Sequence, residues 1–171
     1  AEADSPLGFQ NGNKYSYPVV GCNQRQLEEK HVDLLRYGRT YEPLFAYTES
    51  KPGSDWTKAT YDDSSWKKGE TGFSSREVKG STIRHLGTLW NTPSLWLRKT
   101  FFAGSETGNL ALRVAHDGDT RIYLNGTLVY EKQGRDYCIV NLDKELRAAL
   151  TEGTNLLAVE TNKGHTQFFD V

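Results

Sequence analysis

The sequence predicts an all-β fold, an antiparallel β-sandwich or jelly roll with one or two short helices. From residue 44 onward, short runs of strand-forming residues follow one another at close spacing with turn residues between them. The 171 residues include 4 Trp, 9 Tyr, 7 Phe and 16 Gly, a composition that favours strands and turns. No strand–helix–strand alternation is apparent, which disfavours a parallel sheet.

Nine strand-like runs are expected, over residues 44–49, 82–90, 94–102, 109–116, 119–124, 127–132, 136–142, 154–162 and 166–171. The clearest signal is IYLNGTLVY (122–130), because Asn125 and Gly126 both tolerate the positive φ of a type I′ hairpin turn. The segment NLLAVET (155–161) is apolar on both faces and therefore predicts a central, covered strand.

Two short helices are expected outside the strands. The first covers residues 24–36 with Asn23 as its N-terminal cap, and it either packs on the sandwich or belongs to a linker. The second covers residues 143–150, with Asp143 as its cap and Gly153 just beyond its end.

The composition excludes several classes of function. A net charge of −1, from 21 basic and 22 acidic residues, provides no basic face for nucleic acid and no polybasic membrane anchor. No apolar run is long enough to insert into a membrane. Cys22 and Cys138 allow one bridge, although Cys138 also fits as a small apolar strand residue. The absence of Met suggests a processed or excised chain.

A series of motifs resembles the galactose-binding-domain-like modules that accompany family 2 glycoside hydrolases and related large secreted bacterial enzymes. The motifs are PLFAYTESKPGSDW (43–56), YDDSSWKKGETGFS (61–74), LWNTPSLWLRKTFF (89–102), LALRVAHDGDTRIYLNGTLVY (110–130), LTEGTNLLAVETN (150–162) and QFFDV (167–171). The resemblance gives a sandwich domain over 44–171, and it leaves 1–43 as a lead-in from a linker or a neighbouring domain.

The resemblance implies a secreted, periplasmic or cell-surface protein without catalytic activity of its own. Its expected partners are a glycan or oligosaccharide and the catalytic domain of the same polypeptide. Some such modules bind sugars at loops on one end, and many act only as spacers or braces. The sequence departs from the usual Gly-Gly-Gln-aromatic-Asp-Val-Gly ending between Gly164 and Val171.

A sugar site needs an aromatic ring for the C–H face of the pyranose and polar groups for its hydroxyls. Trp90 is the tryptophan expected to be exposed, because a loop signal follows it, whereas Trp96 is expected in the core. Trp56 and Trp66 are expected to pin a loop to the end of the barrel. The candidate ligand-binding residues are Trp90, Asn91, Asp117, Asp119, Arg135, Tyr137, His165 and Gln167.

Other chemistry has weaker support in the sequence. Asp117 and Asp119 are carboxylates that a glycosidase could use, but one loop rarely supplies both sides of a cleft, and an Asp-Gly-Asp turn explains them. No cofactor is required, and a structural Ca²⁺ at Asp62 and Asp63 competes with a capped turn at the same residues. Arg98 is expected to donate structural hydrogen bonds.

The sequence therefore leaves two main functions open. The first is a carbohydrate-binding accessory module, and the alternative is a structural, interdomain β-sandwich without a ligand of its own. The alternative predicts an exposed apolar docking patch within residues 7–47. A stand-alone hydrolase is the least favoured function, because the motifs of hydrolytic sites are missing.

Overall fold

A computed structural model of the chain describes residues 44–75, 87–104, 110–165 and 167–171, with residues 137–141 described as backbone only. The lead-in over 1–43, its helix over 24–36 and Cys22 lie outside the described residues. Both alternatives for Cys138, a bridge to Cys22 and a small apolar strand residue, therefore stay as the sequence left them.

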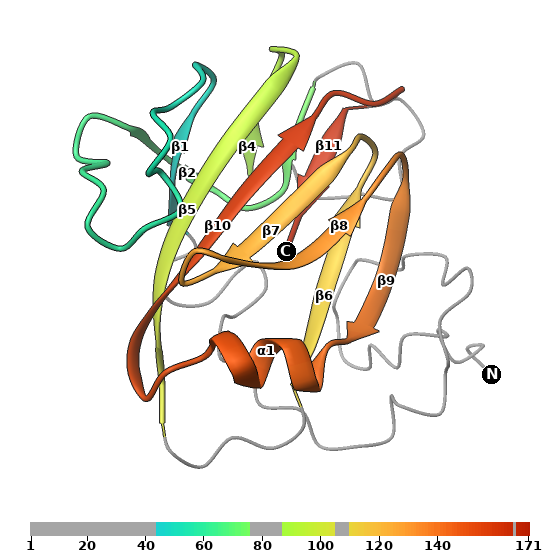
Figure 1. Ribbon diagram of the computed structural model, residues 1–171. Helices are drawn as coiled ribbons and strands as arrows, with labels where there is room; N and C mark the ends of the chain where they lie inside the picture. The colour runs from blue at the N-terminus through green and yellow to red at the C-terminus, as the bar shows by residue number, and fades with distance from the viewer. Residues whose placement is uncertain (1–43, 76–86, 105–109, 166) are drawn as a thin grey trace, which may run out of the picture.

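The described residues form two sheets that pack as a sandwich (Figure 1). In order across the sheet, the six-stranded sheet consists of β2 (Lys67–Glu70), β1 (Leu44–Thr48), β5 (Ser94–Ala103), β10 (Gly153–Asn162), β7 (Thr120–Leu124) and β8 (Thr127–Lys132). The five-stranded sheet consists of β4 (Thr88–Leu89), β3 (Phe73–Ser74), β11 (Phe168–Asp170), β6 (Ala111–His116) and β9 (Asp136–Asn141). Neighbours are antiparallel except for β3 and β4, so the predicted antiparallel β-sandwich is confirmed.

The core lies between the sheets because alternate residues of each strand point inward. On β5, Leu95 and Leu97 are fully buried in the main cluster, whereas Trp96 packs in a separate cluster on the opposite face of the sheet. The largest side chains of the interior include Phe45, Tyr47, Phe73, Trp90, Leu97, Ile122, Leu157, Val159 and Phe169. As predicted, β10 is central and lies between β5 and β7.

Two short strands were not predicted from the sequence. β2 has the sequence KKGE, which carries no apolar alternation, and β3 is only two residues long. Both form because a neighbouring strand supplies their hydrogen-bond partners, which a local pattern cannot reveal. The strand expected over 82–90 is reduced, within the described residues, to Thr88 and Leu89 of β4.

The helix predicted near residue 143 is present as α1 (Asp143–Ala149), which lies across one end of the sandwich in Figure 1. The prediction that Asp143 caps it is wrong, since the N-cap is Leu142 and forms no side-chain cap bond. Asp143 instead accepts hydrogen bonds from the Leu110 amide at 2.8 Å and from Arg147 Nε at 2.9 Å. These two donors lower the pKa of Asp143, the Leu110 amide having the larger effect.

The β7–β8 hairpin turns at Asn125 and Gly126, with φ of 50° and 84°, as the sequence predicts. The Asn125 side chain also donates to the Ala149 carbonyl at 2.8 Å and to Asn155 Oδ1 at 2.7 Å. Its own Oδ1 accepts the Leu156 amide at 2.9 Å. Asn125 therefore joins the hairpin to the end of α1 and to β10.

We expect Asn125→Ala to lower the free energy of unfolding by about 2 kcal/mol, because it removes these hydrogen bonds and strains the positive φ. Asn125→Gly keeps the backbone freedom and loses only the side-chain bonds, so its loss is expected to be smaller. Urea denaturation of both variants measures the difference. Equal losses would show that the backbone conformation contributes nothing.

Candidate functional site

The candidate ligand-binding residues gather at one end of the sandwich, here called the rim. The rim comprises the turns at residues 90–93, 117–119, 133–135 and 163–167, with residue 166 outside the description. Backbone bonds tie these turns together, from the Asn162 amide to the Asp119 carbonyl at 2.9 Å and from the Lys163 amide to the Pro93 carbonyl at 2.7 Å. The candidate residues of these four turns therefore lie at the same end of the sandwich.

Asp117 is the centre of the rim. Its side chain is 2% exposed, and its Oδ1 accepts Nε of Arg135 at 2.6 Å. Its Oδ2 accepts the backbone amide of Gln167 at 3.2 Å. A buried carboxylate needs such donors because burial removes its hydration. Asp117 therefore joins three of the rim turns through its hydrogen bonds.

Glycines allow the backbones of the rim to approach closely. A Cβ atom at Gly118 would collide with the carbonyl oxygen of Asn162, and one at Gly164 would collide with the carbonyl oxygen of Asp117. The turns at 117–119 and 163–167 are therefore in direct backbone contact. Little space remains between them for a ligand group.

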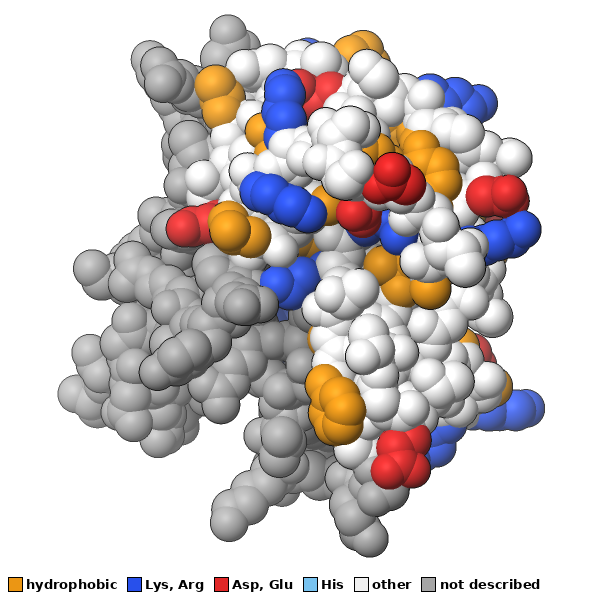
Figure 2. All heavy atoms as spheres, turned by 90° about the vertical axis from the view of Figure 1, so that its left-hand side faces the viewer, with side chains coloured by type: hydrophobic (Ala, Val, Ile, Leu, Met, Phe, Trp, Pro, Cys, Tyr) orange, Lys and Arg blue, Asp and Glu red, His pale blue; other side chains and the backbone are white. Residues whose placement is uncertain are grey.

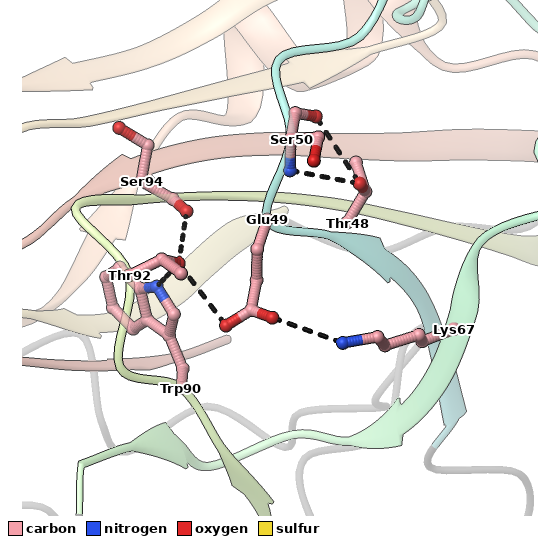
Figure 3. A network of polar contacts seen from close by, with 7 residues as sticks. All are labelled: Thr48, Glu49, Ser50, Lys67, Trp90, Thr92 and Ser94. Atoms are coloured by element: carbon pink, nitrogen blue, oxygen red, sulfur yellow. Dashed lines mark hydrogen bonds and ion pairs between the residues drawn. The ribbon is translucent and has the colours of Figure 1, made fainter.

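The expectation that Trp90 is exposed is wrong. The ring is fully buried in the main core, and its Nε1 donates to Thr92 Oγ1 at 3.0 Å. Figure 3 shows Thr92 at the centre of a polar network, with Glu49 Oε1 at 3.3 Å and the Ser94 carbonyl at 3.0 Å. The other carboxylate oxygen of Glu49, Oε2, forms an ion pair with Lys67 Nζ at 3.2 Å. The turn at 90–93 therefore directs the indole inward, where it cannot stack on a sugar.

The other candidates divide into buried and exposed residues. Gln167 is 3% exposed, has φ of 48°, and donates from Nε2 to the Thr92 carbonyl at 2.9 Å. Asp119 is exposed and accepts the Gly134 amide at 2.8 Å. Asn91, Arg135 and His165 are also exposed. Tyr137 lies in β9, where only its backbone is described.

None of the four tryptophans is fully exposed. Trp56 and Trp96 are buried together with Ala158, and Tyr61, Trp66 and Tyr123 pack against them. This cluster lies on the outer face of the six-stranded sheet, because the neighbouring residues Leu97, Leu157 and Ile122 belong to the interior. The loop from Trp56 to Trp66 is thus held against the outer face of the sheet. The prediction that these tryptophans fix it to the end of the barrel is wrong.

Arg98 donates structural hydrogen bonds, as the sequence predicted, and these bonds hold the loop. Its side chain is 4% exposed and lies on β5 beneath the loop. Its guanidinium donates to Asp63 Oδ2 at 2.7 Å and to the carbonyls of Trp56, of Lys58 at 3.0 Å and of Tyr61 at 3.3 Å. One buried cation therefore satisfies four oxygens of a single loop.

The expected calcium ligands have other partners. Asp63 is the ion-pair partner of Arg98, and Asp62 accepts the Ser64 amide at 2.9 Å. The hydrogen bonds from Ser64, its side chain before its backbone amide, lower the pKa of Asp62. Within the described ranges, no three His, Cys, Asp or Glu side chains gather as metal ligands. The capped turn therefore explains Asp62, and the ion pair with Arg98 explains Asp63.

A buried polar cluster that the sequence did not predict lies beside the rim. His116 is fully buried at the end of β6, with Nδ1 2.8 Å from the Gly118 carbonyl and Nε2 2.7 Å from Tyr130 Oη. Tyr130 Oη also lies 3.1 Å from Asp136 Oδ2. A histidine that ends an apolar strand was the available signal, but its partners come from two other strands.

Comparison with family models and with curated proteins finds no match. Solved structures do match, among them a Bacteroides uniformis β-glucuronidase with TM-score 0.54 and 17% identity over 77% of this chain. A family 2 β-glucuronidase gives 0.53 and 18% over 78%, and a family 2 member from Bacteroides cellulosilyticus gives 0.51 and 19% over 74%. The fold is that of a domain of family 2 glycoside hydrolases. The chain covers only 15–18% of those three proteins.

Removal of the Arg98 guanidinium tests whether it holds the loop from Trp56 to Trp66. Arg98→Met keeps an apolar stem but leaves Asp63 and three carbonyls without their donor, so we expect a loss of about 3 kcal/mol in unfolding free energy. Lys58→Ala, which removes only an exposed pair with Asp55, should cost less than about 0.5 kcal/mol.

Urea denaturation gives the free energies, and limited proteolysis within residues 56–66 reports the loop itself. If Arg98→Met were as stable and as protease-resistant as Lys58→Ala, the guanidinium would not be what holds the loop.

Proposed function

We propose that this chain is a non-catalytic β-sandwich module that braces neighbouring parts of a larger carbohydrate-active polypeptide. The observation that carries the proposal is that the polar groups at the centre of the rim are paired with one another. The buried carboxylate of Asp117 accepts hydrogen bonds from Arg135 and from the Gln167 amide. A rim in which buried polar groups satisfy one another fixes turns in place and presents few of those groups to a ligand.

The fold supports a place within a larger chain. The solved structures that match are several times longer than this chain, so the module corresponds to one domain among others there. We accordingly propose the catalytic domain of the same polypeptide as the partner, and a secreted, periplasmic or cell-surface location. Within the described residues no helix is long and apolar enough to cross a membrane.

The surface that would contact the neighbouring domain is not identified by a large apolar patch. Figure 2 shows hydrophobic side chains as separate patches between charged ones on the described part of the face it draws. The docking patch expected within residues 7–47 lies mostly outside the described residues, although Leu44 is 47% exposed. Phe102, at the α1 end of β5, is 70% exposed.

The carboxylates do not support hydrolysis by this module. A glycosidase needs two carboxyl groups that face one sugar ring across a cleft. Asp117 is buried and paired with Arg135, whereas Asp119 is exposed and bonded to the Gly134 amide. Both carboxylates are therefore held by the turn between β8 and β9, through Arg135 and Gly134.

Carbohydrate binding is the second candidate, and the exposed residues of the rim favour it. Asn91, Asp119, Arg135 and His165 surround the same end of the sandwich. The Arg135 side chain is 48% exposed while Asp117 orients its Nε, and a guanidinium suits the carboxylate of a uronate. This candidate lacks a described exposed aromatic ring at the rim.

Calorimetric titration of the 171-residue chain with galactosides, xylosides and uronates separates the two functions. The bracing function predicts no saturable heat up to millimolar sugar. Saturable heat with a uronate that is lost in Arg135→Gln and retained in Lys58→Gln would overturn it and establish a rim site.

Incubation with aryl β-glycosides, including an aryl β-glucuronide, tests for catalysis. We expect no release of the aryl group above the buffer rate. Release by the wild-type chain that disappears in Asp119→Asn, with the fold retained by circular dichroism, would contradict the non-catalytic assignment.

A further inference from the structure

The His116 cluster links the two sheets at neighbouring edges. His116 and Asp136 are register partners on β6 and β9 of the five-stranded sheet, whereas Tyr130 belongs to β8, the edge strand of the six-stranded sheet. The Tyr130 hydroxyl lies between them, 2.7 Å from His116 Nε2 and 3.1 Å from Asp136 Oδ2. The rings of His116 and Tyr130 meet edge to face.

The number of protons decides how many of these contacts are hydrogen bonds. The Gly118 carbonyl only accepts, so His116 Nδ1 carries a proton. Tyr130 has one hydroxyl proton and cannot donate it both to Nε2 and to the Asp136 carboxylate. With a neutral imidazole and an ionised carboxylate, one of the two tyrosine contacts therefore lacks a proton.

One additional proton resolves this conflict. If the proton is on Nε2, His116 donates to Tyr130 and Tyr130 donates to Asp136. If the proton is on Asp136, both hydrogen bonds run in the opposite direction. In either arrangement every contact has a donor, and the cluster has no net charge.

We propose that His116, Tyr130 and Asp136 form a proton-linked clasp between the edges of the two sheets, which acid completes by one hydrogen bond. The clasp flanks the β8–β9 turn, where Gly134 and Arg135 bond the carboxylates of Asp119 and Asp117. Protonation therefore acts on the strands that position two of the rim contacts.

The surroundings of His116 set the pH range. Burial lowers its pKa, opposed by the hydrogen bond to the Gly118 carbonyl and then by the charge of Asp136. Asp117, itself paired with Arg135, adds a smaller opposing charge from the β6–β7 turn. From β11 the register partner is the apolar Phe169. Proton uptake by folded His116 is thus expected below the ordinary histidine value of 6.5.

The sign of the stability change follows from this shift. Because the unfolded chain binds a proton at His116 at a higher pH than the folded chain, unfolding takes up a proton within that interval. The contribution of His116 is fully present above its unfolded pKa and is lost as the pH falls towards the folded pKa. Folding stability should therefore decrease through this interval on acidification.

Nitrogen-15 NMR of the His116 ring in the full chain tests the clasp directly, between about pH 4.5 and about pH 8. We expect the neutral ring to carry its proton on Nδ1 and to titrate with a midpoint below 6.5. A neutral ring protonated on Nε2 would overturn the proposal without any variant.

One variant and a control test the coupling of His116 to Asp136. Asp136→Asn removes the facing charge and should lower the midpoint of His116 by about one pH unit. Tyr123→Phe is the control, because it removes a hydroxyl from the outer face of the six-stranded sheet, away from His116, and it should leave the midpoint unchanged. An unchanged midpoint in Asp136→Asn, with an amide spectrum showing the native fold, would show that His116 titrates independently of the clasp.

Discussion

The antiparallel pairing of β5 with β10 along ten residues of each strand is the constraint on which the rest of the structure depends. Because side chains alternate, this register sends Leu97 and Val159 into the sandwich and Arg98 and Ala158 to the outer face. The outer side chains then determine where the loop from residue 56 to 66 can lie. The same pairing brings Ser94 beside Asn162, where the turns of the rim begin.

Buried polar groups then decide what each loop can do. Arg98 on the outer face and Asp117 at the rim are charged and almost inaccessible, and each is held by donors or acceptors from segments distant in sequence. Leaving either charge without its partners would cost several kcal/mol, so the loops are fixed by polar satisfaction as much as by apolar packing. This polar satisfaction of the rim is the basis of the bracing function that we propose.

Pattern and turn chemistry made most of the strands, the Asn125–Gly126 hairpin and the central position of β10 predictable, because these depend on neighbours in sequence. The same reasoning placed Trp90 wrongly. A loop signal after a tryptophan says where the chain turns, but the direction of the indole depends on Thr92 and on Glu49, which follows β1 and is distant in sequence. Asp143 failed as a helix cap for a similar reason, since the Leu110 amide competes for its carboxylate.

The sequence by itself determined the sandwich class and the positions of most strands along the chain. Only the tertiary structure decided which of the candidate residues are exposed, that Asp63 pairs with Arg98, and that His116, Tyr130 and Asp136 meet across the two sheets. The physical reason is the range of the forces involved. Strand pattern and turn type are fixed by residues a few positions apart, whereas burial and hydrogen-bond partners depend on segments that meet only after folding.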